Sequence, residues 1–459
     1  MPGSPSKSLP GPGHLFRLLA SPPARLICRP WFDRLALRGL AGFYFPISRA
    51  WAAATVADGD LDRFVAALPI ERLPSGSERS TRRALARVVE TERVWRRALG
   101  DWDATLFGGS GDPAACVAAE MHRRKTSHAF MGSRFGFSAL RSAAPAVRLD
   151  IATPEDTEHR HGARLRDPAS AYALPDPLPK VEASPPMPAE GGCQYWLRFP
   201  SPLGDTVWAH VFEPEGVANP PSLIYGHGLA MEIESLDGIE DSSIYLPRLG
   251  ARLIRPELPW HNRRRLPGTY GGEPVLAGLP SSAFDFLPAA AREFAILVAW
   301  CRARGSKRVG VGGVSLGGLV AQSVLNRAHA WPAAARPDVG FLVTVSGDVV
   351  GLALGSSLAR AVGVSSAVAA AGWTPDLLAR WRPLVDPLGE PVARPEDIVM
   401  VLGQADDLTP FADGLALARR WRVPAENLYL RHQGHFSATV GLLSAPEPWR
   451  RLARLLGAG

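Results

Sequence analysis

The sequence predicts an α/β protein whose second half forms a mostly parallel, doubly wound sheet and whose first half is a helical extension. Two observations predict this fold. From residue 194 onward, short apolar runs alternate with helical patterns, as buried parallel strands joined by helices do. The pentapeptide Gly313-Val314-Ser315-Leu316-Gly317 lies between such a strand, 308–312, and the start of a helix, 319–325. We expect the rest of the chain to be organised around this turn.

Length, composition and charge indicate a large globular protein. A chain of 459 residues predicts two domains, or one domain with large additions. The formal net charge is +7, and the first 57 residues carry seven basic residues against the single acid Asp33. The remainder is nearly neutral, which argues against a nucleic-acid-binding surface on the second half.

Four scattered cysteines form neither a disulfide framework nor a zinc motif. They are Cys28, Cys116, Cys193 and Cys301. The first residues lack the apolar run and small-residue cleavage site of a secretory signal. A cytoplasmic location with reduced thiols is the expectation. The chain has no phosphate-binding loop, dinucleotide fingerprint or paired metal motif, so we expect no cofactor and no metal.

Four segments of different composition divide the chain. Residues 1–24 are rich in proline and poor in core-forming side chains, so we expect them to be disordered. Residues 25–170 carry helical patterns. Prolines dominate 171–193, which predicts a linker. The strand-rich segment 194–459 follows.

An apolar run at 35–57 stands out within the first segments. Arg38, Pro46 and Arg49 interrupt it, so it is a poor membrane span. We expect these residues to pack as helices onto the rest of the protein. The alternative is peripheral membrane contact through residues 1–57, with arginines facing anionic lipid.

The strand-rich segment has a regular order of elements. Its predicted strands are 194–199, 206–212, 222–225, 252–255, 308–312, 339–345, 398–402 and 428–430. Its predicted helices include 289–302, the segment after the pentapeptide, 412–420 and 449–456. Apolar strands that alternate with helices predict a buried parallel sheet.

Ser315 is the candidate nucleophile. Strand, sharp turn and helix around a G-x-S-x-G sequence are the context of a nucleophile elbow, in which the serine hydroxyl projects above the sheet. The flanking glycines have no Cβ, so the strand and the helix can approach closely. A serine hydroxyl becomes an effective nucleophile when a histidine takes its proton and a carboxylate orients that histidine.

On these residues the segment 194–459 resembles the α/β-hydrolase superfamily. The resemblance implies a sheet with helices on both faces and a triad in the chain order serine, acid, histidine. It also implies a helical cap insertion at 351–394, between two strands. The apolar content of this cap favours a hydrophobic acyl group in the substrate. The alternative is that these apolar residues pack against the helical N-terminal region.

The base and the acid follow later strands. His435, in Gly434-His435-Phe436, comes after the last strand, where the superfamily places its base; His432 is the rival. Asp406 follows strand 398–402 in a G-x-x-D pattern that resembles the superfamily's acid loop. Asp407 and Asp348 are the alternative acids.

Two backbone amides are candidates for the oxyanion hole. One is the amide of Leu316, directly after the nucleophile, and the other is the amide of Leu229 in the loop after strand 222–225. Gly228 keeps this loop free of a Cβ next to the reacting carbonyl.

Three further side chains are candidates for the substrate-binding side of the pocket. They are His227, His261 and Arg263. We expect His227 to orient the loop that carries Leu229 and not to act as a second base. Arg263 belongs to a run of three arginines that would suit an anionic substrate group, with a solvated loop as the alternative.

The sequence therefore predicts a serine hydrolase that cleaves small-molecule carboxylic esters through an acyl-enzyme. An amidase or peptidase on the same triad is the nearest alternative. A scaffold or membrane-recruited protein with an inactive hydrolase fold is the alternative of another class.

Overall fold

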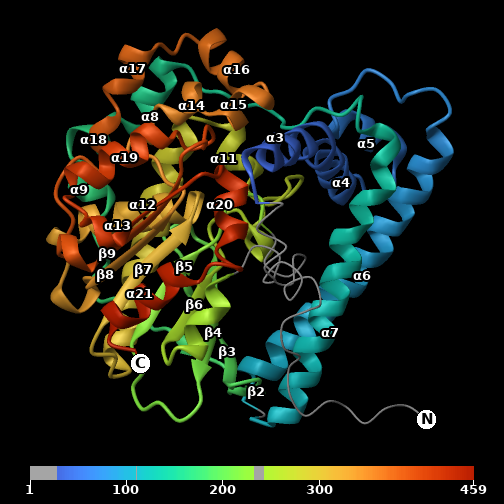
Figure 1. Ribbon diagram of the computed structural model, residues 1–459. Helices are drawn as coiled ribbons and strands as arrows, with labels where there is room; N and C mark the ends of the chain where they lie inside the picture. The colour runs from blue at the N-terminus through green and yellow to red at the C-terminus, as the bar shows by residue number, and fades with distance from the viewer. Residues whose placement is uncertain (1–27, 110, 232–241, 459) are drawn as a thin grey trace.

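The computed structural model describes residues 28–109, 111–231 and 242–458 (Figure 1). The predicted disorder of 1–24 concerns residues outside these ranges. A helical region, blue to teal in the figure, lies beside a central sheet that is flanked by further helices. The chain is therefore an α/β protein with a helical N-terminal extension, as the sequence predicts.

The described residues form one sheet of ten strands. Their order is β1-β3-β4-β6-β5-β7-β8-β9-β10, and β2 also pairs with β3. The strands are β1 Glu182–Ala183, β2 Met187–Ala189, β3 Gly192–Pro200, β4 Thr206–Pro214, β5 Ser222–Gly226, β6 Arg252–Pro256, β7 Val309–Val314, β8 Val339–Val343, β9 Ile398–Gly403 and β10 Leu428–Arg431. From β6 to β10 all neighbours are parallel, whereas β4 is antiparallel to β3 and β6. The predicted mostly parallel sheet is confirmed.

Each face of the sheet packs against its own helices. Neighbouring residues such as Leu223 and Ile224 in β5 point to opposite faces and join different apolar clusters. Ile224 shares its cluster with α12 Ser281–Ala303, α13 Leu316–Arg327 and α19 Phe411–Arg420. Leu223 shares its cluster with α10 Tyr245–Arg248 and α21 Glu447–Leu456. The sheet is thus doubly wound.

Short helices fill the segment between β8 and β9. They are α14 Leu352–Gly355, α15 Ser357–Ala361, α16 Val364–Ala370, α17 Pro375–Ala379 and α18 Arg382–Val385. Helices α14 to α17 gather at the top of the view in Figure 1, and α18 lies lower, at the left. The remaining short helices of this half are η3 Ser242–Ile244, η4 Asn262–Arg264, α11 Glu273–Ala277, η5 Ala328–Ala330, η6 Ala333–Ala335, η7 Pro395–Asp397, η8 Ala425–Asn427 and α20 His435–Gly441.

The proline-rich segment 171–193 contributes to the sheet. Strands β1 and β2 both pair with β3, on the side away from β4. Pro188 lies within β2, which fits an edge strand because proline cannot donate a ladder hydrogen bond. These residues were expected to form a linker, and prolines alone do not reveal edge pairing.

Helices dominate the described residues before this segment. They are α3 Pro30–Gly39, η1 Leu40–Tyr44, α4 Phe45–Ala57, α5 Leu61–Ala67, α6 Glu78–Phe107, α7 Pro113–Gly132, η2 Ser133–Leu140, α8 Pro154–Arg166 and α9 Pro168–Ala171. Helix α6 buries Leu85, Val88, Trp95 and Trp102 along one stripe, so its amphipathic pattern fixes which side faces the protein. No helix in the described part of the chain has the length and apolar character to cross a bilayer.

The second part of the apolar run at 35–57, from Phe45 onward, packs into the protein core. Helix α4 is buried along almost its whole length and belongs to the same apolar cluster as the sheet and α12. Arg49, in α4, donates to Glu273, in α11, at 2.7 Å, and both side chains are 1% exposed. A buried ion pair of this kind joins residues 224 positions apart.

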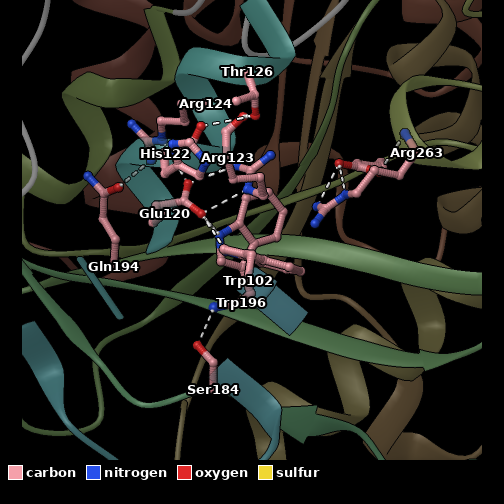
Figure 2. A network of polar contacts seen from close by, with 11 residues as sticks. Trp102, Glu120, His122, Arg123, Arg124, Thr126, Ser184, Gln194, Trp196 and Arg263 are labelled. Atoms are coloured by element: carbon pink, nitrogen blue, oxygen red, sulfur yellow. Dashed lines mark hydrogen bonds and ion pairs between the residues drawn. The ribbon is translucent and has the colours of Figure 1, made fainter. Parts of the chain in front are cut away.

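A second buried contact joins α6 and α7 to β3 (Figure 2). The carboxylate of Glu120 accepts from the indole N–H of Trp102 at 2.7 Å and of Trp196 at 3.2 Å. Burial alone would raise the pKa of Glu120, but the charges of Arg123 and Arg124 hold the pKa well below its usual range. The Arg123 guanidinium also lies over the rings of Trp102 and Trp196. The helical region is therefore packed onto the sheet.

Candidate active site

Ser315 lies in the turn between β7 and α13. Its backbone has φ 53° and ψ −120°, a region that costs a non-glycine residue about 1–3 kcal/mol. A Cβ on Gly317 would overlap the backbone of Gly226, so only glycine allows this helix to approach β5. The strained turn and the close approach are those of a nucleophile elbow.

The loop after β5 lies against this turn. The N–H of Gly317 donates to the carbonyl of His227 at 2.9 Å. A Cβ built on Gly228 would lie 3.7 Å from the Cβ of Ser315, so the Gly228 backbone borders the serine. Leu229 follows directly, and Leu316 begins α13, where the first amides of a helix have no partner within the helix. The two amides expected to bind an oxyanion thus belong to adjacent segments.

His227 and His261 are both buried within the loops around Ser315. The Nδ1 of His227 lies 2.8 Å from the carbonyl of Gly228, and its Nε2 accepts from the N–H of Leu258. Burial lowers the pKa of His227 to about 4, so this ring is neutral near pH 7. These contacts fit the expected role of His227 in orienting the loop.

His261 supports the same loop from the other side. Its Nδ1 lies 2.8 Å from the carbonyl of Pro259, and its Nε2 accepts from the N–H of Ala230 at 3.3 Å. Burial, together with the nearby His227 ring, holds the pKa of His261 well below its usual range. Both ring nitrogens are engaged with the backbone, so His261 supports the loop that carries Leu229.

Arg263 lies in an aromatic environment and is paired with an acid of the same chain. Its guanidinium donates to Glu257 at 2.7 Å and lies over the rings of Trp102, Trp196 and Trp208. The side chain is 6% exposed. The neighbouring Arg264 is likewise paired, with Asp205 and Glu293. The run of arginines in the sequence does not reveal that Arg263 and Arg264 pair with acids of the same chain.

Asp406 is the one of the three candidate acids that contacts His435. Its Oδ2 lies 2.8 Å from His435 Nδ1, and its Oδ1 accepts from the amides of Leu408 and Thr409. Asp407 instead accepts from the Ser357 hydroxyl at 2.8 Å. Asp348 faces Arg382 at 3.3 Å.

His435 begins α20, directly after β10, and is buried, whereas His432 is exposed. Thr409 Oγ1 lies 3.2 Å from His435 Nδ1 and 2.9 Å from Asp406 Oδ2. Thr409 also donates to the carbonyl of Thr344, which follows β8. Sequence reasoning missed Thr409, although a threonine three residues after an aspartate is a pattern for a local side-chain turn.

The three candidate residues follow strands of the same parallel set. Ser315 comes after β7, Asp406 after β9 and His435 after β10. The N–H of Ser315 donates to Val343 in β8, and the N–H of Thr344 donates to Val401 in β9. All three therefore lie at the carboxyl edge of the sheet, where open α/β sheets hold their active sites.

No family model matches the chain, and no curated protein matches it. Similar solved structures include an acetyl xylan esterase from Paenibacillus sp. R4, with 12% identity and a TM-score of 0.44 over 69% of this chain and 97% of that one. Acetyl xylan esterase 1 from Thermoanaerobacterium sp. JW/SL YS485 has 15% identity and a TM-score of 0.42 over 64% and 96% of the two chains.

A Mycobacterium tuberculosis puromycin-hydrolyzing peptidase has 15% identity and a TM-score of 0.41 over 58% of this chain and 40% of that one. The chain's own topology consists of a mostly parallel, doubly wound sheet with a strained strand–turn–helix at Ser315. By this topology the chain has the α/β-hydrolase fold.

Proposed function

We propose that this chain is a serine hydrolase that cleaves carboxylic esters through an acyl-enzyme, with Ser315, Asp406 and His435 as its triad. The observation that carries the proposal is the 2.8 Å contact between Asp406 and His435 at the sheet edge that also carries the elbow serine. A carboxylate on Nδ1 leaves Nε2 as the proton acceptor, which is the tautomer that a general base requires.

In the proposed reaction, Ser315 Oγ attacks the ester carbonyl while His435 takes the serine proton. The carbonyl oxygen becomes an oxyanion that accepts from the amides of Leu316 and Leu229. A preorganised donor of this kind contributes about 2.7–4 kcal/mol to transition-state stabilisation. His435 then returns the proton to the departing alkoxide, which leaves as the alcohol. Water, deprotonated by the same histidine, hydrolyses the acyl-enzyme and restores the serine.

The proposed substrate has a hydrophobic acyl group. Support comes from the short helices between β8 and β9, which are tied to the acid loop. The Ser357 hydroxyl and amide of α15 both bond to Asp407, next to the proposed acid. Leu352 and Leu358 of these helices are partly buried and pack onto the apolar core. A cap of this composition favours an apolar acyl chain over a charged one.

The substrate class is tested with p-nitrophenyl esters of graded acyl length and the matching p-nitroanilides. We expect hydrolysis of the esters, with kcat/KM that rises from acetyl toward longer acyl chains and slow turnover of the anilides. Anilide hydrolysis as fast as that of the matched ester would indicate the amidase alternative. A folded wild-type protein that hydrolyses none of these esters would contradict the proposal.

A further inference from the structure

Helix α3, near the start of the described chain, contacts the helix that begins with His435. The residues of α3 are exposed or half-buried except Asp33, which is 8% exposed. A carboxylate as the one buried side chain of a surface helix requires polar partners, because a buried charge without them is costly. Its partners lie at the first turn of α20, about 400 positions later in the sequence.

The Asp33 carboxylate accepts hydrogen bonds directly from the two residues after His435, and the Ser437 hydroxyl links it to the residue before His435. Its Oδ1 accepts from the amide of Phe436 at 2.6 Å and from the amide of Ser437 at 3.0 Å. The Ser437 hydroxyl donates to Oδ2 of Asp33 and accepts from the amide of Gly434 at 2.9 Å. The amides of Phe436 and Ser437 thus donate directly to Asp33, and the amide of Gly434 is linked to it through the Ser437 hydroxyl.

Two further features indicate that this contact is built into the fold. A Cβ on Gly434 would overlap the Asp33 carboxylate, so glycine is required for the close approach. The Gln433 side chain donates to the carbonyl of Cys28 at 3.0 Å, and Cys28 packs against Val440 and Leu443. The same N-terminal segment therefore holds both the loop before His435 and the helix after it.

Asp33 caps the first turn of α20, although a capping residue normally lies directly before its helix in the sequence. The first amides of a helix lack partners within the helix, and a carboxylate there satisfies them and is favoured by the helix dipole. The residue before His435 is a glycine, which has no side chain to cap with. Removing the Asp33 carboxylate would leave the amides of Phe436 and Ser437 without their acceptor and release the turn that aims the imidazole.

We propose that Asp33 is a positioning residue for His435. It fixes the backbone on both sides of the histidine, so that the ring keeps its Nδ1 on Asp406 and presents Nε2 to the serine. This inference rests on the proposed function, since it assigns Asp33 a part in the same reaction. It also gives the helical extension a role in catalysis through the contact between α3 and α20.

The experiment compares Asp33→Ala and Asp33→Asn with Asp60→Ala in the full chain. Asp60 caps α5 by accepting from the amide of Arg63 at 2.8 Å, so its loss removes a similar cap elsewhere in the helical region. We expect Asp33→Ala to lower kcat on a p-nitrophenyl ester by about 10- to 100-fold with KM within about twofold, because a small misplacement of a catalytic group has an effect of this size. Asp33→Asn keeps an oxygen acceptor and should recover most of the rate.

Hydrogen exchange of the 434–441 segment provides a readout independent of ester hydrolysis. We expect faster exchange there in Asp33→Ala and wild-type exchange there in Asp60→Ala. Faster exchange with an unchanged kcat would overturn the proposal, as would equal losses of kcat in Asp33→Ala and Asp60→Ala, or unchanged exchange. If the wild-type protein hydrolyses no ester, the proposed function fails, and exchange still decides whether Asp33 holds this turn.

Discussion

Asp406 and His435 contact each other through Oδ2 and Nδ1 at 2.8 Å, and the rest of the Asp406 carboxylate is also occupied. Its Oδ1 accepts from the amides of Leu408 and Thr409, so the carboxylate cannot rotate freely. The adjacent Asp407 is turned toward Ser357 on α15. The acid loop therefore divides its two aspartates between the histidine and the helices that follow β8.

The first prediction concerns this division. Asp406→Asn should lower kcat on the order of 10⁴-fold, because an amide in place of the carboxylate favours the wrong imidazole tautomer. Asp407→Asn is the matched variant and should lower kcat far less. Steady-state kinetics on one ester decides the order. A larger loss in Asp407→Asn would mean that the acid has been misassigned by one residue.

The second prediction concerns the buried pair between α4 and α11. Arg49→Met should lower the free energy of unfolding by about 3–5 kcal/mol, since it leaves the Glu273 carboxylate buried without its cation. Urea denaturation measures the loss. The control is Arg82→Met, which breaks an exposed pair with Glu78 on α6 and should leave stability nearly unchanged. Equal effects of the two variants would contradict the role given to the buried pair.

The third prediction concerns the helical extension. A chain that starts at residue 190 lacks α3 to α9, β1 and β2, so it exposes apolar surface that α4, α6 and α7 cover. It should aggregate, and the intact protein should not sediment with anionic vesicles at low salt. Sedimentation assays test both statements. A soluble, active truncation, with salt-dependent sedimentation of the intact protein alone, would support the membrane alternative.

The fourth prediction concerns Asp386, which follows α18 and accepts from the amides of Val349 and Val350. Burial, with the charge of Asp348 nearby, raises the pKa of Asp386 to about 7 despite Arg382. The folded protein therefore holds this proton more tightly than the unfolded chain, whose aspartates titrate near pH ~4. Stability from this group is present at low pH and is lost as pH rises from about 4 to about 7.

Asp386→Asn has no carboxyl to ionise, so it should not lose this stability as pH rises. Its Tm should exceed the wild-type Tm at pH 9, and the difference should shrink toward pH 5, where the wild-type carboxyl is protonated. Thermal unfolding across this pH range provides the measurement. A difference in Tm that does not change with pH would show that Asp386 does not titrate in this way.

Local patterns were enough to predict strands β3 to β10 of the sheet and to identify the candidates for the proposed triad, but not the edge strands β1 and β2. The strand before Ser315 and the helix after it are continuous in sequence, so the elbow can be read without distant contacts. Asp406 and His435 each follow a predicted strand. Because parallel strands all end at the same edge of a sheet, the parallel direction of these strands alone brings Asp406 and His435 to one side of the sheet.

Long-range pairing explains what the sequence did not reveal. Asp33 reads as one acid in a basic segment, yet its partners lie in α20. Arg263 reads as a cation available to a substrate, yet Glu257 and three tryptophans surround it. In both cases the charge is visible in the sequence, but its partner depends on how distant elements pack.

The most direct test of the account is covalent labelling of the full chain with a fluorophosphonate probe, followed by peptide mapping. We expect the label on Ser315, and we expect Ser315→Ala to lose both the label and ester hydrolysis while it keeps the wild-type Tm. Ser80 is an exposed serine on α6, and Ser80→Ala should keep both the label on Ser315 and ester hydrolysis. A label that persists in folded Ser315→Ala, or a folded wild-type protein that takes up none, would contradict the assignment of Ser315 as the nucleophile.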